Sequence, residues 1–437
     1  MKKVFVFLSI LLLCVSCTEK GLFNDEYETD GEVPQVTDPI PINSPKPQAS
    51  LANQLTFTKE QQAFAASSGD FALKCLGELY KESPSSMVFS PLSLQYALAM
   101  TVNGASGKTA EEITRTLGFG ADLDALNAYC NLLLNRLPAL DPDVEISLAD
   151  ALVVDKGYRL LPAYKNTVES VYYAPVEYMS FSDPKPVVDR INEWAYRNTN
   201  GLIFPLLKEE DLRGVVATLM NALYFKAPWA GPETMFLPEL TMQGEEFHKE
   251  NGGKTKVDLM PTTDYFGYAG LDGFRMVEIP YAGGRFAMYV LLPDKAGGLQ
   301  KMLNRIQKDS WKELRESLSY KTKVHLRLPK FETASNFGLI PALKALGIRK
   351  AFDGSAEFDR MFDGKRSYIG NVMQKAKIKV TEWGTEAAAV TVVAMCGAFL
   401  PAVPPPETDF FIDHAFVYFI AERKTGTILF EGVYTGE

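Results

Sequence analysis

The sequence has few of the side chains on which hydrolytic enzymes depend. It contains only three histidines, His248, His325 and His414. No G-x-S-x-G nucleophile turn and no H-E-x-x-H zinc-binding pair accompanies them in the sequence. We therefore expect a protein that is not an enzyme, in which each histidine is structural or solvated. We also expect no cofactor and no metal site.

Cysteine and clustered positive charge are also scarce. Of the five cysteines, Cys75, Cys130 and Cys396 lie far apart in the sequence. Such spacing does not form the framework of a disulfide-rich domain. The 45 Lys and Arg against 54 Asp and Glu give a net charge of −9, and no basic run is interleaved with aromatics. Nucleic acid is therefore not an expected partner.

The N-terminus has the features of an export signal. Met1-Lys2-Lys3 precedes an apolar run, residues 4–15, that is too short to span a bilayer as a helix. Ser16-Cys17 then resembles the bacterial lipobox, although Cys14 stands where an aliphatic residue is usual. The alternative is ordinary cleavage and release. We predict a signal peptide over residues 1–17, lipidation of Cys17, and anchoring to the bacterial cell envelope, at the outer membrane and facing outward.

Residues 18–54 differ in composition from the rest of the chain. They are polar and punctuated by proline, as in EVPQVTDPIPINSPKPQAS. Such a stretch has too few large apolar residues to form a core, so we predict a flexible tether. No comparable break or repeat follows, and 437 residues with 46% hydrophobic content can bury a large core. We therefore predict one domain over residues 55–437.

Helical and strand patterns are mixed within that domain. Apolar residues recur at helical spacing over residues 64–80, and residues 109–112 (TAEE) have the pattern of a capping box that opens a helix. Later runs such as residues 286–292 (FAMYVLL) and 416–420 (FVYFI) are continuously apolar, as buried strands are. These patterns predict an α+β fold with a mostly helical N-terminal part and large sheets.

The segment from residue 382 to residue 406 is the most informative. It begins EWGTEAAAVTVV, and no residue from 387 to 406 is charged. A membrane helix is one alternative, but Pro401 and residues 404–406, all proline, would break it. A buried strand is a second, favoured by the β-branched residues at 390–393. The third is given by a family resemblance.

Motifs throughout residues 55–437 resemble those of the serpins. The pattern E-x-G-T-E-A-A-A at residues 382–389 is similar to the serpin hinge. Six further matches follow the family's order: FSPLSLQYALAM (89–100), NGASGKTAEEI (103–113), LMNALYFKAPW (219–229), VEIPYAGGRFAMYVLLP (277–293), LRLPKFE (326–332) and TGTILFEGVY (425–434). The chain thus resembles a serpin of bacterial lipoprotein type. The resemblance implies the α+β serpin fold, with three β-sheets and an exposed reactive-centre loop at about residues 382–409.

The resemblance also implies a function, suicide-substrate inhibition of serine endopeptidases. The target protease cleaves the loop and remains attached as an acyl-enzyme while the loop inserts as a strand into the central sheet. The expected partners are thus serine proteases in covalent complex, and the membrane through the N-terminal lipid, for a protein that is otherwise a monomer. Two alternatives stay open: a non-inhibitory serpin that acts as a surface binding module, and an inhibitor of cysteine proteases.

The hinge positions carried over from the family are small or polar. Insertion would turn alternate side chains inward, and a large or charged residue among them should convert an inhibitor into a substrate. The inward positions would be Thr385, Ala387, Ala389, Thr391, Val393 and Met395. The whole hinge comprises Glu382, Gly384, Thr385, Glu386, Ala387, Ala388 and Ala389.

The resemblance places the reactive bond between Ala398 and Phe399, because Ala398 lies 14 positions after Gly384. Gly397 and Leu400 are the neighbouring candidates. A small Ala before the cut would suit elastase-like proteases, whereas a cut after Phe399 or Leu400 would suit chymotrypsin-like ones. Trypsin-like targets are not expected, since the loop contains no Lys or Arg.

Two features of the loop depart from the usual pattern. Gly384 and Phe410, which matches the aromatic residue opening the next strand, are 26 positions apart, more than is usual for inhibitory serpins. Cys396 lies in this loop, where it is either a small strand residue or a reactive thiol.

Gating positions of the family can also be carried over. Ser90, Ser93 and Asn221 match the polar shutter beneath the central sheet, and Trp229 matches the aromatic residue where the loop first enters. Gln374 stands where the family has a shutter histidine. An amide donates and accepts hydrogen bonds but does not titrate, so pH sensitivity from a shutter histidine should be absent.

Overall fold

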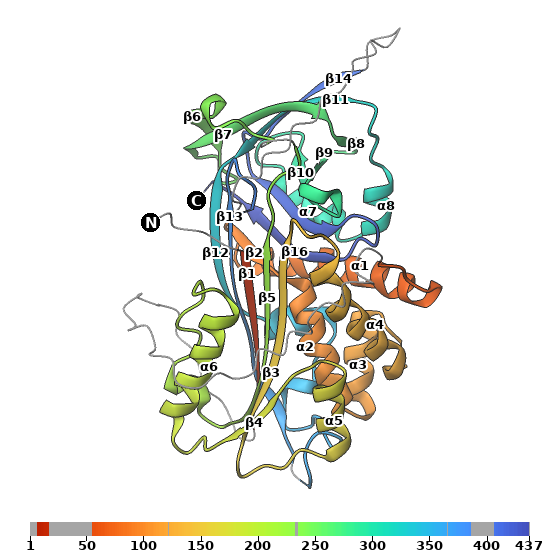
Figure 1. Cartoon of the computed structure of the whole chain (residues 1–437), viewed down its shortest axis with the longest axis vertical. Helices are drawn as coiled ribbons and strands as arrows, with labels where there is room; N and C mark the ends of the chain where they lie inside the picture. The colour runs from red at the N-terminus through yellow and green to blue at the C-terminus, as the bar shows by residue number, and fades with distance from the viewer. Residues whose placement is uncertain are drawn as a thin grey trace.

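A computed structural model of the chain describes residues 7–16, 55–120, 122–231, 235–364, 366–385 and 406–436. One long sheet runs through most of the length of the molecule (Figure 1). In the lower half most helices gather on one side of this sheet, and α6 (Pro184–Asn198) covers the other side. Two further sheets form the upper half. Cys17 and the predicted tether lie outside the described residues.

The N-terminal part of the described chain is mostly helical, as the sequence predicted. Four helices precede the first long strand of the domain, and five further helices are distributed along the rest of the described chain. In order they are α1 (Lys59–Glu82), α2 (Pro91–Asn103), α3 (Gly107–Leu117), α4 (Leu123–Arg136), α5 (Pro162–Ser170), α6, α7 (Leu299–Ile306), α8 (Trp311–Glu316) and α9 (Ile340–Leu346).

A pair of local hydrogen bonds explains where α1 begins. Thr58 caps α1 because its Oγ1 accepts from the backbone N of Gln61 (3.2 Å), while the side chain of Gln61 accepts from the N of Thr58 (3.0 Å). The capping box predicted at residues 109–112 is wrong. Helix α3 begins earlier, after Ser106, and Thr109 is buried inside its first turn. There the Thr109 hydroxyl accepts from the backbone N of Glu357 (3.0 Å), so its role is tertiary.

The described strands form three sheets. Sheet A has the order β12 (Phe331–Gly338), β13 (Tyr368–Val380), β1 (Phe7–Ser16), β5 (Val215–Lys226), β3 (Glu145–Asp155), β4 (Val176–Met179). Sheet B has the order β2 (Met87–Phe89), β16 (Ile428–Tyr434), β15 (Phe416–Glu422), β10 (Phe286–Pro293), β9 (Phe274–Pro280), β8 (Gly267–Leu271). Sheet C has the order β14 (Glu407–Phe411), β11 (Lys323–Pro329), β7 (Lys254–Tyr265), β6 (Met242–His248). The predicted α+β class with three sheets is confirmed.

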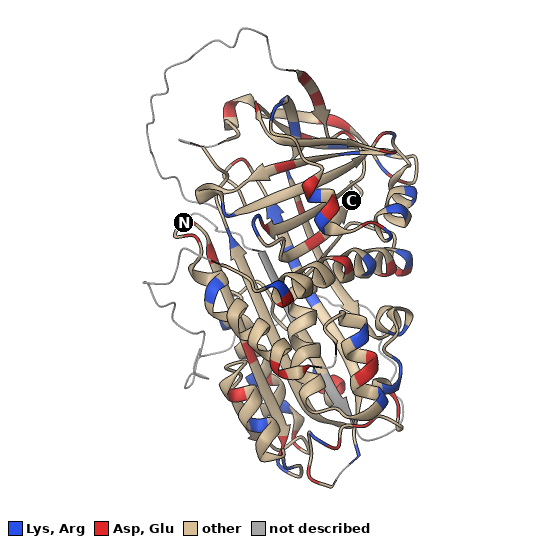
Figure 2. Cartoon of the chain, turned by 90° about the vertical axis from the view of Figure 1, so that its right-hand side faces the viewer, with Lys and Arg blue, Asp and Glu red and all other residues tan. Residues whose placement is uncertain are grey.

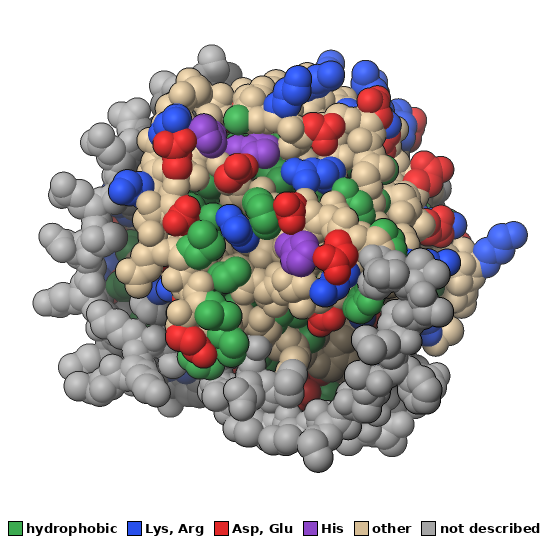
Figure 3. Space-filling view, turned by 90° about the horizontal axis from the view of Figure 1, so that it is seen from above, with side chains coloured by type: hydrophobic (Ala, Val, Ile, Leu, Met, Phe, Trp, Pro, Cys, Tyr) green, Lys and Arg blue, Asp and Glu red, His purple; other side chains and the backbone are tan. Residues whose placement is uncertain are grey.

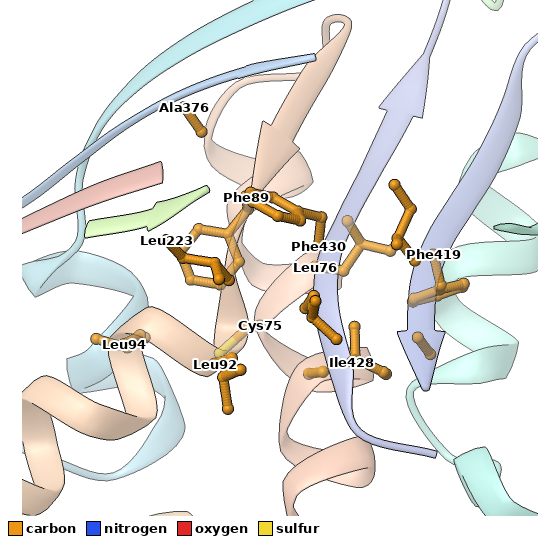
Figure 4. Close-up of a cluster of buried hydrophobic side chains, with 14 of the residues drawn as sticks. Cys75, Leu76, Phe89, Leu92, Leu94, Leu223, Ala376, Phe419, Ile428 and Phe430 are labelled. Atoms are coloured by element: carbon orange, nitrogen blue, oxygen red, sulfur yellow. The ribbon is translucent and has the colours of Figure 1, made fainter. Parts of the chain in front are cut away.

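The main hydrophobic core lies between sheets A and B and the N-terminal helices (Figure 4). Strands β10 and β15 are buried along their whole length, which explains why their sequences are apolar without alternation. Burial of this extent is the main favourable term in folding. Side chains labelled in Figure 4 come from α1, β2, α2, sheet A and sheet B: Cys75, Leu76, Phe89, Leu92, Leu94, Leu223, Ala376, Phe419, Ile428 and Phe430.

The apolar N-terminal run forms a central strand of sheet A. Strand β1 lies between β13 and β5 and is antiparallel to both. Leu11 and Leu13 are fully buried in the main core, and Leu12 is fully buried on the opposite face, against the core beneath α6. Removal of residues 1–17 as a signal peptide stays a prediction. The structure adds that residues 7–16, when present, complete the middle of this sheet.

The described surface carries both signs of charge. Acidic and basic side chains are interspersed over the helices and sheets (Figure 2). Among the described residues, no helix has the length and apolar character needed to cross a bilayer.

Candidate functional site

The hinge begins in a tight turn at the upper end of β13. Thr381 and Gly384 exchange backbone hydrogen bonds, each with a donor to acceptor distance of 3.1 Å. Gly384 has a φ of +116°, a backbone conformation that residues other than glycine rarely adopt. A Cβ at this position would approach the carbonyl oxygen of Ala227 to 2.3 Å. Glycine therefore lets the chain reverse closely against the end of β5.

Thr385 is docked directly beyond this turn. Its N donates to the O of Ala227 and its O accepts from the N of Ala227, both at 2.8 Å. Its hydroxyl is 2.8 Å from the hydroxyl of Tyr281, and the side chain is fully buried. The first inward position predicted from the sequence is therefore held by a backbone pair and a side-chain hydrogen bond.

Trp229 closes the same corner from the other side. Its ring stacks on Tyr281 with a centroid distance of 4.7 Å and an interplanar angle of 5°. Its Nε1 donates to the carbonyl oxygen of Thr381 (2.9 Å). We call this group, Ala227, Trp229, Tyr281, Gly384 and Thr385, the hinge junction.

Glu382 connects the turn to residues that flank two strands of sheet C, β6 and β11. Its carboxylate accepts from the hydroxyl of Thr241 (2.8 Å) and pairs with the Nζ of Lys330 (3.0 Å). Burial alone would raise the pKa of Glu382, but hydrogen bonds from a backbone N–H, Lys330 and Thr241 lower it below its usual value. The carboxylate thus stays charged and holds the turn in place. Trp383, between these anchored residues, is 43% exposed.

The predicted shutter residues Ser90, Ser93 and Gln374 meet beneath the middle of sheet A. Ser90 caps α2, because its Oγ accepts from the N of Ser93 (3.1 Å). The amide of Gln374 bonds Ser90 twice: its Oε1 accepts from the Ser90 N (2.7 Å) and its Nε2 donates to the Ser90 O (3.1 Å). All three side chains are fully buried. Glutamine therefore supplies both a donor and an acceptor to the residue that caps α2.

Asn221 lies on the same row of sheet A but is separated from Gln374 by β1. Leu11 pairs with Asn221 on one side and with Gln374 on the other. Asn221 donates from Nδ2 to the Oδ1 of Asp150, its neighbour on β3, at 2.8 Å. The Oδ1 of Asn221 and the Oδ2 of Asp150 have no hydrogen-bond partner within the described part of the chain.

Asp150 was missed by the sequence analysis. Burial raises its pKa to about 7, against the opposing effect of the hydrogen bond from Asn221. The shutter thus contains a group that titrates near neutral pH, although it is not the histidine whose absence was noted. A single carboxylate inside the apolar run SLADALVV, residues 147–154, is the signal that could have revealed it. We call Ser90, Ser93, Asp150, Asn221 and Gln374 the shutter cluster.

The far end of the loop is anchored in sheet C. Strand β14 pairs in parallel with β11, and Phe410 is fully buried with the guanidinium of Arg275 at 5.3 Å from its ring centroid. The remaining predicted site residues lie outside the described residues: Glu386, Ala387, Ala388, Ala389, Cys396, Gly397, Ala398, Phe399, Leu400 and Cys17.

The described residues give no separate catalytic centre. His414 is nearly buried, with Nδ1 at 2.7 Å from Asp413 Oδ1 and Nε2 at 2.8 Å from the carbonyl oxygen of Pro293. Burial raises the pKa of Cys130 to about 12 and also raises that of Cys75, which opposes formation of a thiolate. Within the described ranges no cluster of three His, Cys, Asp or Glu side chains could hold a metal. The upper end of the molecule shows histidines interspersed with both charge signs and apolar groups (Figure 3).

Comparison with known proteins agrees with this geometry. Residues 66–435 match the family described as Serpin (serine protease inhibitor). An uncharacterized serpin-like protein of Thermococcus kodakarensis is 35% identical over 362 residues, which cover 81% of this chain and 82% of that protein.

Solved structures show the same likeness. Serpin48 of the insect Tenebrio molitor is similar with a TM-score of 0.75 and 28% identity, covering 87% of this chain and 99% of that one. Human thyroxine-binding globulin, solved in complex with thyroxine, is similar with a TM-score of 0.74 and 26% identity, covering 86% of this chain and 98% of that one. The chain therefore belongs to the serpin family, whose members are generally protease inhibitors rather than enzymes.

Proposed function

We propose that this protein inhibits serine endopeptidases of the elastase-like or chymotrypsin-like type by suicide-substrate trapping. The observation that carries the proposal is the docking of Thr385 on Ala227. The turn from Thr381 to Gly384 reverses the chain after β13, and the Thr385 pair aligns it with the upper end of β5. A chain that continues in this direction enters the space between β5 and β13.

That space has the capacity that the mechanism needs. Strand β1 shows that sheet A takes a ten-residue strand there, Phe7–Ser16, paired on both sides. A loop strand of this length would release roughly 10 to 30 kcal/mol, from about 0.5–1.5 kcal/mol per net hydrogen bond plus apolar burial. Each ~1.4 kcal/mol changes a rate tenfold, so part of this energy suffices to stop deacylation of a distorted protease.

The chemistry is supplied by the target. The protease serine Oγ attacks the carbonyl carbon of Ala398, and the amide nitrogen of Phe399 leaves with a proton as a new N-terminus. The remaining ester joins protease and inhibitor. Insertion of the loop then carries the ester away from its initial position and distorts the oxyanion hole before water can hydrolyse it. This scheme requires no catalytic side chain from the serpin.

The proposal includes a location for the inhibitor, at the bacterial outer membrane. The predicted lipid on Cys17 and the tether of residues 18–54 would hold the inhibitor at the outer membrane, outside the cell. Proteases met there would be captured before they reach envelope proteins. The binding-module alternative stays open because thyroxine-binding globulin, whose structure is similar to this one, was solved with thyroxine bound.

The experiment mixes the chain beginning at Thr18 with elastase, chymotrypsin, trypsin, subtilisin and papain. We expect an SDS-resistant complex with elastase or chymotrypsin, and a released peptide whose mass corresponds to residues 399–437. A complex with papain alone would support the cysteine-protease alternative. Loop cleavage without any complex, or no cleavage at all, would contradict trapping and favour the binding module.

A matched pair of variants tests the hinge directly. Thr385→Arg places a long charged side chain at a fully buried, hydrogen-bonded position, so insertion should fail at its first step. We expect at least a hundredfold loss of stable complex while the loop is still cleaved. Trp383→Arg makes a comparable change two residues away, at a side chain that is 43% exposed, and should trap normally. Equal trapping by both variants would refute the role of the hinge junction.

A further inference from the structure

We propose that the space between β5 and β13 is a binding site for the chain's own N-terminal segment, and that a chain retaining this segment is an inactive inhibitor. The occupant is β1, Phe7–Ser16, an apolar peptide in extended conformation. The proposal of a binding site rests only on the geometry of sheet A. The loss of inhibition rests on the proposed function, because it assumes that the loop must enter the same space.

Strand β1 is integrated into the sheet on both edges. Nine of its residues, from Leu8 to Ser16, pair with β13, and all ten, from Phe7, pair with β5. Its described side chains also fit both faces, since Leu11 and Leu13 join the main core while Leu12 joins the core beneath α6. Each of these three side chains is fully buried. Pairing on both edges and burial on both faces are what a central strand requires.

The segment and the loop would use the same partners on β5. Thr385 pairs with Ala227, directly beyond the end of β5, and Phe7 pairs with Phe225, two positions earlier in the chain. A loop inserted in the Thr385 register would place Thr391 opposite Asn221, which is the partner of Leu11. Neighbouring strands lie about 4.8 Å apart, so the space holds one strand only. Occupation by one segment therefore excludes the other.

The two occupants differ in chemistry at the shutter cluster. Leu11 presents a hydrocarbon side chain to the row that contains Asn221 and Asp150, each of which has an oxygen with no hydrogen-bond partner in the described part of the chain. A buried polar atom without a partner is costly. The hydroxyl of Thr391 would bring a donor to this row. The N-terminal segment is thus an imperfect occupant, and the polar row favours the loop once the segment is gone.

In this proposal the apolar N-terminal run has two roles, as an export signal and as a strand that fills sheet A. An export signal and a fully buried strand both require a short continuous apolar run, and periodicity does not separate them. A precursor that folds with its leader attached would have its sheet already filled. Removal of the leader would then open the space and produce the form able to trap a protease.

The experiment compares the full chain of 437 residues with the full-length double variant Leu11→Glu/Leu13→Glu. Two carboxylates at fully buried positions should expel the segment from the sheet. We expect the double variant to form SDS-resistant complexes with elastase at least tenfold faster than the full chain. It should approach the rate of the chain beginning at Thr18. The matched control is full-length Leu22→Glu, the same change outside β1, which should behave as the unaltered full chain.

Amide hydrogen exchange supplies a readout that is independent of inhibition. Amides of residues 217–224 and 372–377 should exchange slowly in the full chain and at least tenfold faster in the double variant. A third variant, Leu11→Thr, adds a hydroxyl beside Asn221 and should slow both exchange and trapping further. This variant introduces no charge, so it tests the site even if the double variant does not fold.

The outcomes separate the two proposals. If the full chain traps elastase as fast as the chain beginning at Thr18, or if exchange in β5 and β13 is equally fast in both, the inference is overturned. If no form traps any protease while the difference in exchange is present, the proposed function fails and the binding site stands.

Discussion

The hinge junction, which begins directly after β5, and the shutter cluster, which includes Asn221 of β5, differ in how completely their polar groups are bonded. At the hinge junction, Thr385 uses its N, its O and its hydroxyl, and the indole N–H of Trp229 has an acceptor. At the shutter cluster the Gln374 amide is bonded on both sides, yet Asn221 and Asp150 each have an oxygen with no partner in the described part of the chain.

This difference shows that the upper end of sheet A is held by a complete set of hydrogen bonds, whereas its middle buries polar oxygens that lack a partner in the described part of the chain. Complete bonding at the hinge junction fixes the direction in which the loop starts. Unpartnered oxygens at the shutter cluster make the middle of the sheet sensitive to the side chain that lies there. In the proposed mechanism, the start of the inserting strand is therefore fixed where Thr385 pairs with Ala227, whereas the energy of insertion depends on the row of Asn221, six positions earlier in the chain.

The largest expected effect on stability is at the shutter cluster. The pKa of Asp150 is raised to about 7 by burial, so the folded state holds a proton that the unfolded state loses near pH 4. Stability from this group should fall as pH rises from about 4 to 7 and stay constant above 7. Asp150→Asn removes this loss and should increase the free energy of unfolding by about 2 to 4 kcal/mol at pH 8, with little change near pH 4.

Urea unfolding at pH 4.5, 6 and 8 checks this pH dependence. Glu145→Gln, an exposed position on the same strand, is the control and should give a curve parallel to the unaltered protein. A parallel curve for Asp150→Asn as well would show that Asp150 titrates normally.

A smaller effect is expected at the hinge turn. Gly384→Ala forces a side chain into a φ of +116° and toward the carbonyl of Ala227. We expect a loss of about 2 to 3 kcal/mol in stability, measured by thermal unfolding, and slower trapping because Thr385 is displaced. Gly354→Ala is the control, since a Cβ there has no neighbour within 4 Å. Equal stability of the two variants would contradict the packing described for the turn.

The smallest effect isolates one hydrogen bond of the hinge junction. Trp229→Phe keeps an aromatic ring against Tyr281 but removes the donor to the carbonyl of Thr381. A loss of about 1 kcal/mol in thermal stability is expected. Trp383→Phe, at the exposed neighbour, should change nothing measurable. A larger loss would mean that the buried bulk of the indole ring, in addition to its hydrogen bond, holds the corner.

Much of the fold was predictable because its motifs are local. The continuously apolar runs at residues 286–292 and 416–420 predicted buried strands, and both became central strands of sheet B, β10 and β15. The helical spacing at residues 64–80 became part of α1. The two strands are buried on both faces and the helix is buried along one side, so the spacing of their apolar residues is visible in the sequence itself.

The missed features depend on neighbours that are distant in sequence. Thr109 has the spacing of a cap, but its hydroxyl is used by Glu357, which no local pattern indicates. Tyr281 completes the hinge junction through Thr385, 104 positions away. The strand formed by residues 7–16 could not be distinguished from a leader, because both need the same apolar run.

The position of strand β16 determines when the hydrophobic core of this protein can form. It is the last strand in the part of the chain that the structure describes, and it lies inside sheet B between β2 and β15. Ile428 and Phe430 belong to the main core. A chain that is synthesised or exported from its N-terminus therefore cannot close this core until residues 428–434 arrive. A leader that is removed before that point would leave the middle of sheet A vacant when the core closes, whereas a leader that is retained until then would fill it.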